Sequence, residues 1–197
     1  MGSASPELQK TIRYLAHSPN DEGAGVPETL HDHLRAVADR AAGFAAAFGA
    51  QEQAHAAGLL HDLGKYADQF QRRLSDPHEP GRDHWTAGAV SFASTGRRLG
   101  VAPAIAVCGH HAGLPAVPAD GHAWFKAIAD RVLGDRGKPP RDRVFTETDL
   151  SLLHHRYLTD GLPRPAIRDG LCLGDGLAAD MLDVRMLFSA LVDADYL

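Results

Sequence analysis

The sequence predicts an all-α fold in a single domain, because apolar residues recur at helical spacing and strand signals are weak. From about Thr29 to Phe48 the apolar residues follow one another at alternating steps of four and three, and the run closes at Gly49. Sustained alternation of apolar and polar residues does not occur, and β-branched residues are few. A chain of 197 residues can bury a real core within one domain.

The other helices follow from the same periodicity and from the proline- and glycine-rich stretches between them. Ser5 and Pro6 suit the N-cap and first position of a helix that runs to about His17. Another helix spans about 51–62 and breaks at Gly64. Further helices are expected near residues 66–74, 84–98, 101–110, 122–133, 146–157 and 177–197. Loops are expected at residues 18–27, 76–81, 112–121, 134–140 and 161–176.

The composition is that of an ordinary globular protein, with 44% hydrophobic and 23% charged residues. A net charge of −5 argues against a broad basic face that grips duplex DNA, but it leaves room for a narrow single-strand groove. Cys108 and Cys172 are two lone thiols, which favours a reducing compartment. Since the chain shows no long apolar run and no apolar leader, we expect a cytoplasmic protein that neither spans a membrane nor is secreted.

The 12 histidines are the unusual feature, and several of them suit a metal site. Imidazoles and carboxylates are the ligands that hold pairs of divalent transition metals. Two such metals a few ångströms apart can activate a water for attack on a phosphodiester. The candidate metal ligands are His33, the pair His61-Asp62, His84, the pair His110-His111, and Asp195.

Helical phase separates two of these candidates from neighbours of the same type. His33 lies about 60° from the centre of the apolar stripe of its helix, whereas His31 lies about 100° away. The alternative for His33 is a core histidine whose ring nitrogens are satisfied by backbone carbonyls. In the last helix Asp195 falls within about 20° of the centre of the apolar stripe, and Asp193 points to the opposite side. A bare carboxylate on a core face is costly unless it is paired, protonated or metal-bound.

The His61-Asp62 pair is the expected catalytic centre, together with Lys65. Adjacent side chains on a helix diverge by about 100°, so both can bind one metal while the Asp62 carboxylate bridges to a second. Lys65 follows within one turn and is a candidate for orienting a phosphate; the alternative is a solvated surface lysine. Four or five imidazoles favour Mn, Fe, Co or Ni over Mg, which prefers oxygen ligands.

The remaining histidines divide by context. His110 and His111 end an apolar run before a Gly-Leu-Pro stretch, where the backbone can leave the helix and both rings can point the same way. His84 opens a helix after a loop. His17 is expected at a helix end. Weaker candidates are the doublet His154-His155 and the surface or loop residues His31, His55, His78 and His122.

The order of these residues resembles the HD superfamily of metal-dependent phosphohydrolases. The sequence around these residues is similar to the HD nuclease of the CRISPR type I nuclease-helicase, over roughly residues 14–197. The segments that carry this resemblance are Ala16-His17-Ser18-Pro19, Leu30-His31-Asp32-His33-Leu34, Gly58-Leu59-Leu60-His61-Asp62-Leu63-Gly64-Lys65-Tyr66 with Phe70-Gln71, Gly109-His110-His111-Ala112-Gly113-Leu114-Pro115, and Phe188-Ser189-Ala190-Leu191-Val192-Asp193-Ala194-Asp195. Residues 1–13 would then be an N-terminal extension with the start of the first helix, and residues 14–197 the HD nuclease domain.

The resemblance implies cleavage of single-stranded DNA by a two-metal centre in defence against foreign DNA. His33, His61, Asp62 and Asp195 would hold one metal, and His84, His110 and His111 the other, with Asp62 bridging. A helicase domain or subunit and an RNA-guided CRISPR surveillance complex would be partners. Since the chain stops two residues after Asp195, it is expected to be either an excised nuclease domain or a separate nuclease subunit.

Two other functions stay open at this point. One is an HD phosphohydrolase that acts on nucleotides, which would need basic residues around the metals. The other is a catalytically silent docking module, against which the complete set of ligand types argues. The basic stretch 131–143 is a candidate for contacts to a DNA backbone. The alternative is a solvated loop, because Asp135 and Asp142 dilute its charge. Trp85 and Trp124 are the candidates for base stacking.

Overall fold

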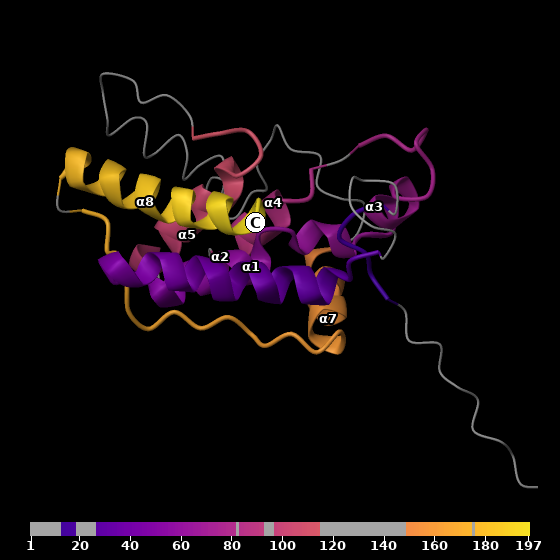
Figure 1. The fold of residues 1–197 in the computed structure, drawn as a ribbon, viewed down its shortest axis with the longest axis horizontal. Helices are drawn as coiled ribbons and strands as arrows, with labels where there is room; N and C mark the ends of the chain where they lie inside the picture. Colours follow the sequence, from indigo (N-terminus) through magenta and orange to yellow (C-terminus); the bar gives the residue numbers. More distant parts are fainter. Residues whose placement is uncertain (1–12, 19–26, 82, 93–96, 115–148, 175) are drawn as a thin grey trace, which may run out of the picture.

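The computed structural model describes residues 13–18, 27–81, 83–92, 97–114, 149–174 and 176–197 (Figure 1). Over these ranges the regular structure is helical, and extended segments pair only at an isolated antiparallel bridge between Leu15 and Thr29. The predicted all-α fold is therefore confirmed for the described part of the chain. None of the helices in these ranges combines the length and the apolar character needed to cross a membrane.

The helices follow the predicted order, with shorter bounds in several places. The described α-helices are α1 (Leu30–Ala45), α2 (Gln51–Leu60), α3 (Asp68–Arg73), α4 (Thr86–Ser91), α5 (Arg97–Gly109), α7 (Leu150–Thr159) and α8 (Leu177–Asp195). Two 3-10 helices join them, η1 (Ala46–Phe48) after α1 and η2 (Leu63–Tyr66) after α2. The expected helix at 122–133 and the basic stretch at 131–143 lie outside the described residues.

Both ends of helix α1 can be explained from its sequence. Thr29 caps its N-terminus by accepting a hydrogen bond from the backbone N–H of Asp32, at 3.1 Å. The helix and the following η1 turn end at Gly49, whose φ of 71° is the left-handed conformation that glycine adopts without strain. Its buried face carries the predicted apolar stripe: Leu30, Leu34, Val37, Ala41 and Ala45.

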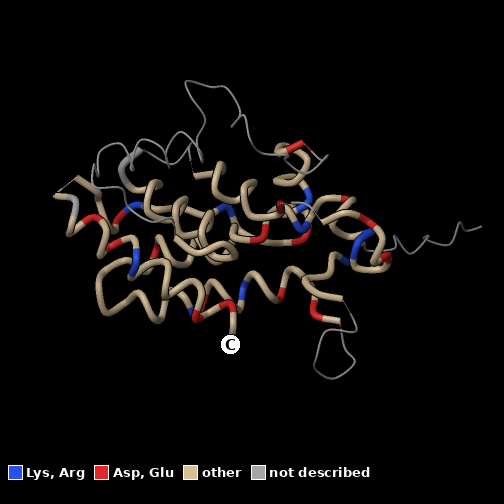
Figure 2. The backbone as a smooth tube through the Cα atoms, turned by 90° about the horizontal axis from the view of Figure 1, so that it is seen from above, with Lys and Arg blue, Asp and Glu red and all other residues tan. Residues whose placement is uncertain are grey.

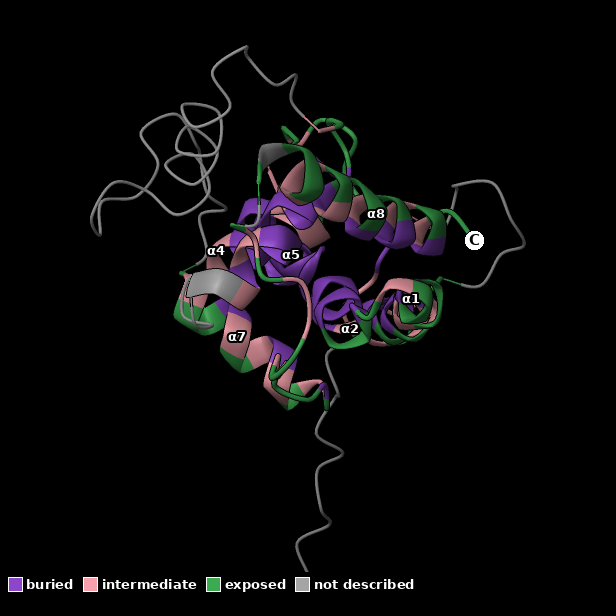
Figure 3. Cartoon of the chain, turned by 90° about the vertical axis from the view of Figure 1, so that its left-hand side faces the viewer, coloured by how far each residue is buried: buried purple, intermediate pink, exposed green. Residues whose placement is uncertain are grey.

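Four helices form the core and place the site at one end of it. Helix α8 packs against α1, α2 and α5, and α2 also packs against α1 and α5. Viewed along α1, the buried sides of these four helices face one another (Figure 3). Glycines permit the closest approaches: a Cβ on Gly58 of α2 would lie 2.5 Å from the Cα of Ala38, and one on Gly88 of α4 would lie 1.8 Å from the Leu60 carbonyl oxygen.

The expected helix that ends at His17 is wrong over residues 13–17, which are not helical. This segment pairs with the residues before α1: the N–H of Ala16 donates to the Glu28 carbonyl at 3.0 Å, and that of Leu30 to the Tyr14 carbonyl at 2.8 Å. Residues 1–12, including the predicted start at Ser5, lie outside the described residues. A pairing with distant residues therefore overrides the local helical pattern.

The expected helix at 84–98 is also too long. Helix α4 begins only at Thr86, because Asp83 accepts hydrogen bonds from the backbone N–H groups of Trp85 and Thr86 and so caps the helix later than predicted. The helix ends at Ser91, and α5 starts at Arg97. This late start leaves His84 outside regular helix.

Candidate metal centre

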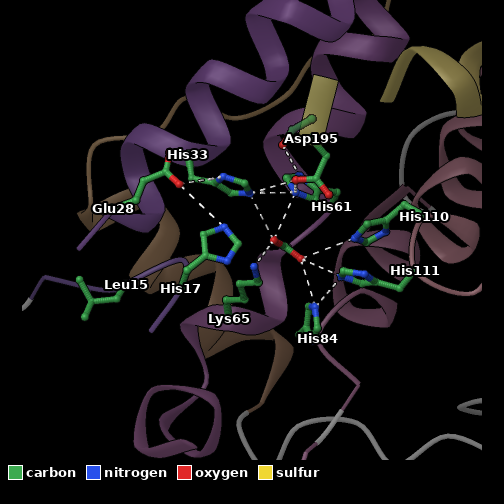
Figure 4. A network of polar contacts seen from close by, with 12 residues as sticks. Leu15, His17, Glu28, His33, His61, Lys65, His84, His110, His111 and Asp195 are labelled. Carbon is green, nitrogen blue, oxygen red and sulfur yellow. Dashed lines mark hydrogen bonds and ion pairs between the residues drawn. The ribbon is translucent and has the colours of Figure 1, made fainter. Parts of the chain in front are cut away.

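The seven candidate metal ligands come together at one place in the structure (Figure 4). His33 projects from the first turn of α1, and His61 and Asp62 follow directly after α2. The other four lie at the ends of further elements: His84 before α4, His110 and His111 after α5, and Asp195 as the last residue of α8. Residues separated by up to 162 positions thus share a single cluster.

One half of the cluster surrounds the Oδ2 atom of Asp62. The Nε2 atom of His61 lies 3.2 Å from this oxygen, and that of His33 lies 3.5 Å from it. The two Nε2 atoms are 3.3 Å apart, and each lies 3.3 Å from the Oδ1 atom of Asp195. Two imidazoles and two carboxylates therefore converge on this half.

The other half surrounds the Oδ1 atom of the same Asp62. The Nε2 atoms of His84, His110 and His111 lie 3.4, 3.7 and 3.9 Å from this oxygen. His84 and His111 also approach each other, with their Nε2 atoms 2.8 Å apart. Because its two oxygens face different groups of nitrogen atoms, Asp62 lies between two sets of candidate ligands.

Backbone carbonyls hold two of the rings in a ligating orientation. The Nδ1–H of His61 donates to the Gly58 carbonyl at 2.8 Å, and that of His110 donates to the Val107 carbonyl at 2.7 Å. In both cases the acceptor is three residues earlier, in the last turn of the helix that the histidine follows, so the end of that helix fixes the tautomer. A neutral ring that donates through Nδ1 presents the lone pair of Nε2 to the cluster.

The cluster fits a divalent cation better than it fits a closed network of hydrogen bonds. The Oδ1 atom of Asp62 and the Nε2 atom of His110 are buried, and neither has a hydrogen-bond partner among the described residues. An unsatisfied buried polar atom is costly, and metal coordination would relieve both. Mixed imidazole and carboxylate donors suit divalent transition metals.

Comparison with known protein families identifies this arrangement. A family model, the HD domain, matches residues 30–150, which is more than half of the chain. The chain belongs to the HD domain family. Curated proteins give no significant match. The matched range holds six of the seven candidate ligands, and Asp195 lies beyond it. HD domains are typically metal-dependent hydrolases, so membership indicates metal-dependent phosphohydrolase activity and the binding of divalent metal.

The charges of this HD domain favour a cation at its centre. Burial by itself would lower the pKa of His61, but Asp62 and Asp195 outweigh burial and raise it to about 10. Burial would likewise raise the pKa of Asp62, yet His61 and Lys65 hold it well below its usual range. Without metal, a proton therefore stays on the His61 ring, and the negative surroundings that retain this proton would also retain a metal ion. Loading a metal at His61 must release that proton.

The outer half of the centre is electrostatically different. Burial, together with the neighbouring His110 and His84, lowers the pKa of His111 to about 4. His111 is therefore a neutral imidazole near pH 7, the form that can ligate a metal. Its side chain is 39% exposed, whereas that of His61 is fully buried. The HD domain thus opens to solvent on the side of His111.

Lys65 is buried, so its interpretation as a solvated surface lysine is wrong. It lies in η2, and its Nζ atom is 2.7 Å from the Oδ2 atom of Asp62. The ammonium group also lies 5.5 Å from the centre of the Phe70 ring. Lys65 therefore offsets the charge of the Asp62 carboxylate directly.

The predictions from helical phase are confirmed. His33 is buried, while His31 is only partly buried and pairs with Asp32. Asp195 keeps only 17% of its side chain exposed and faces the cluster, and Asp193 is exposed. The weaker candidates lie elsewhere: His55 pairs with Asp39, and His154 contacts the Ser91 hydroxyl. Among the described residues, the cluster includes neither His78 nor His155. Cys108 and Cys172 are free thiols, and His122 and Trp124 lie outside the described residues.

Two residues beside the cluster were not predicted. The Oε2 atom of Glu28 lies 3.4 Å from the Nδ1 atom of His33 and 3.8 Å from the Nε2 atom of His17. His17 was expected at a helix end, which is wrong because residues 13–18 are not helical. Since Glu28 stands in a stretch with no helical phase to interpret, periodicity gave no signal for it. For His17, the Ala16-His17-Ser18-Pro19 motif of the family resemblance was the available signal.

Proposed function

We propose that this HD domain is a metal-dependent nuclease that cleaves single-stranded DNA in CRISPR-mediated defence. In this proposal residues 14–197 act with a helicase domain or subunit and with an RNA-guided surveillance complex. The observation that supports it most is the position of Asp62, whose two carboxylate oxygens face two separate groups of nitrogen ligands. Such an arrangement suits two cations that share a bridging carboxylate.

In the proposed centre the ligands divide as the geometry divides them. His33, His61 and Asp195 would hold one cation together with Asp62, and His84, His110 and His111 would hold the other. Since five of the seven ligands are imidazoles, Mn, Fe, Co or Ni would be preferred to Mg. When bound, two such cations supply an activated water and neutralise the charge on a phosphate.

The protein contributes orientation and charge. The carbonyls of Gly58 and Val107 fix the rings of His61 and His110 before any cation arrives. Lys65 holds Asp62 from the protein side and so orients the carboxylate for bridging. His61, Asp62 and Lys65 are therefore the residues to which we assign the greatest effect on catalysis.

The open side of the centre favours a polymeric substrate. His111 is the most accessible of the proposed ligands, with a side chain 39% exposed, and the side chain of the neighbouring His84 is 16% exposed. Trp85 lies beside them, its ring centre 5.3 Å from that of His111 and 5.1 Å from that of His84. An aromatic ring next to an accessible metal centre can stack on a base of a single strand.

The charge distribution also argues against a duplex as the substrate. Figure 2 shows acidic and basic residues interspersed along the described chain rather than gathered on one face. A protein of this kind gains little from counterion release along a duplex, so it would bind DNA mainly through its metal centre. We therefore expect weak binding by this chain alone, with little sequence preference and a shallow dependence on salt.

A substrate panel tests the proposal. The protein, loaded with Mn²⁺ or Ni²⁺, is incubated with circular single-stranded DNA, duplex DNA, single-stranded RNA, deoxynucleoside triphosphates and a cyclic nucleotide. We expect cleavage of the circular single-stranded DNA, and its loss in His61→Ala and in Asp62→Ala. Hydrolysis of the nucleotides instead would make the protein a nucleotide phosphohydrolase. Full activity in either variant would refute the assignment of the site.

A further inference from the structure

His33 differs from the other buried histidines of the centre in what holds its ring. The Nδ1–H groups of His61 and His110 each donate to a carbonyl in the last turn of the helix that precedes them. The Nδ1 atom of His33 faces a side chain instead, the carboxylate of Glu28, at 3.4 Å (Figure 4). Because this partner is a side chain, a single substitution can remove it without changing the helix.

Glu28 reaches His33 from the segment just before α1. His33 lies at the first turn of that helix, and its backbone N–H donates to the Thr29 carbonyl at 3.0 Å. The Glu28 carbonyl accepts the N–H of Ala16, so the backbone of Glu28 is paired with the N-terminal segment. The side chain of Glu28 is 44% exposed, while that of His33 is only 4% exposed. The carboxylate thus covers the solvent side of a buried ring.

The N-terminal segment completes this arrangement. His17 places its Nε2 atom 3.8 Å from the same Oε2 atom of Glu28, and its ring packs edge-on against that of His33 with centres 5.1 Å apart. The amide of Gln71 holds the segment in place: it exchanges two hydrogen bonds of 3.0 Å with the backbone of Leu15 and donates another of 2.7 Å to the Lys65 carbonyl. The segment is therefore fixed to the same turn that carries Lys65.

We propose that Glu28 is a positioning residue for His33. Its carboxylate accepts the Nδ1–H of His33, fixes the tautomer, and turns the Nε2 lone pair toward Asp62 and Asp195. A carboxylate behind a ligating histidine also makes the imidazole a stronger donor, and loss of such a partner typically weakens metal binding about 10- to 100-fold. This inference rests on the proposed metal centre, since it concerns how one of its ligands is held.

A different use of the same residues is a third cation held by His17, Glu28 and His33, whose ligand atoms lie within 4.8 Å of one another. His33 would then have to ligate through Nδ1 while its Nε2 atom faces Asp62 at 3.5 Å. A neutral imidazole has one lone pair and one N–H, so it cannot serve two cations without losing a second proton. The geometry therefore favours a positioning role, and the number of bound ions distinguishes the two uses.

The test measures the binding of Mn²⁺ and Ni²⁺ by titration calorimetry and equilibrium dialysis. The wild-type chain is compared with Glu28→Gln, Glu28→Ala and the control Asp39→Asn. Asp39 also belongs to α1 and also pairs with a histidine, His55, at 3.6 Å, but it lies outside the cluster. We expect two ions in the wild type and in the control. In Glu28→Ala one ion should bind about 10- to 100-fold more weakly.

Glu28→Gln should fall between the two, because its amide oxygen can still accept the Nδ1–H but carries no charge. If Glu28→Ala does not fold, as judged by circular dichroism, Glu28→Gln decides the question. Nitrogen chemical shifts of the His33 ring give a second measure: the wild type should show one tautomer protonated at Nδ1, and Glu28→Ala a mixture.

The possible outcomes separate this inference from the proposed function. A wild-type chain that binds no cation would refute the proposed metal centre itself. Two ions bound with unchanged affinity in Glu28→Ala would refute only the positioning role. A third ion in the wild type that disappears in Glu28→Ala would show that Glu28 is a ligand, which also overturns the inference.

Discussion

Asp62 carries more of the site than any other residue, because each of its oxygens serves a different half. Burial alone would favour its neutral form, yet His61 and Lys65 keep it ionised. An amide in its place could not supply two anionic oxygens. The structure also accounts for the two acids of α8, since Asp195 enters the cluster and Asp193 remains in solvent.

The contrast between these two acids gives a residue-scale prediction. Asp195→Asn removes a carboxylate that lies 3.3 Å from two ring nitrogens, so one cation should bind about 10- to 100-fold more weakly. Asp193→Asn removes the same charge from the same helix at an exposed position and should leave binding unchanged. Calorimetric titration with Mn²⁺ compares them. Equal losses in both variants would mean that net charge, and not ligation, controls affinity.

At the scale of elements, the site is assembled from places where helices begin or end. Of the seven candidate ligands, His33 lies in the first turn of α1 and Asp195 is the last residue of α8. The other five lie next to the ends of α2, α4 and α5. At such ends the backbone leaves regular geometry, so adjacent residues such as His110 and His111 can point the same way. Gly64 forms one of these junctions: its N–H donates to the His84 carbonyl at 2.9 Å, and its lack of a Cβ permits the close approach of the two backbones.

This contact predicts the effect of a single methyl group. A Cβ on residue 64 would lie 2.4 Å from the carbonyl oxygen of His84 and 2.5 Å from its Cα, so Gly64→Ala must push the His84 segment away. We expect a loss of about 1–3 kcal/mol in the free energy of unfolding and weaker binding of the cation near His84. Chemical denaturation and metal titration measure the two effects.

Gly43→Ala is the matched control for this substitution. Gly43 lies within α1, and a Cβ there would meet no atom within 4 Å. Alanine should therefore raise the free energy of unfolding by about 0.5–1 kcal/mol and leave metal binding intact. If Gly64→Ala behaved like this control, the close approach between Gly64 and His84 would not constrain the site.

At the scale of the whole molecule, a buried amide ties the loop after α7 to the helical core. Gln53 of α2 donates to the carbonyls of Leu99 and Leu171 at 2.8 and 3.0 Å, and its Oε1 atom accepts the N–H of Leu171 at 2.7 Å. Gly170 packs directly on this amide, where a Cβ would lie 2.3 Å from Oε1. Three parts of the chain thus meet at one fully buried side chain.

Replacing this amide should cost stability without touching the site. Gln53→Ala leaves the backbone groups of Leu99 and Leu171 without their partner, and we expect the free energy of unfolding to fall by about 2 kcal/mol or more. Gln51→Ala, at the exposed start of the same helix, should stay within about 0.5 kcal/mol of the wild type. Denaturation with urea measures both. A small effect at position 53 would mean that the loop is held by its apolar contacts instead.

The sequence by itself determined the helical fold, the phase of α1 and α8, and the set of residues that meets in the cluster. The fold and the phase of the two helices follow from periodicity, which distinguishes Asp195 from Asp193 along α8. The set of cluster residues follows from their ligand types and from the order of motifs that resembles the HD superfamily. Only the tertiary structure decided which oxygen of Asp62 faces which ligands, that Lys65 is buried, and that Glu28 and His17 lie behind His33. Those facts depend on distances between segments far apart in the chain. A pattern that repeats along one helix carries no information about such distances, because packing against other elements sets them.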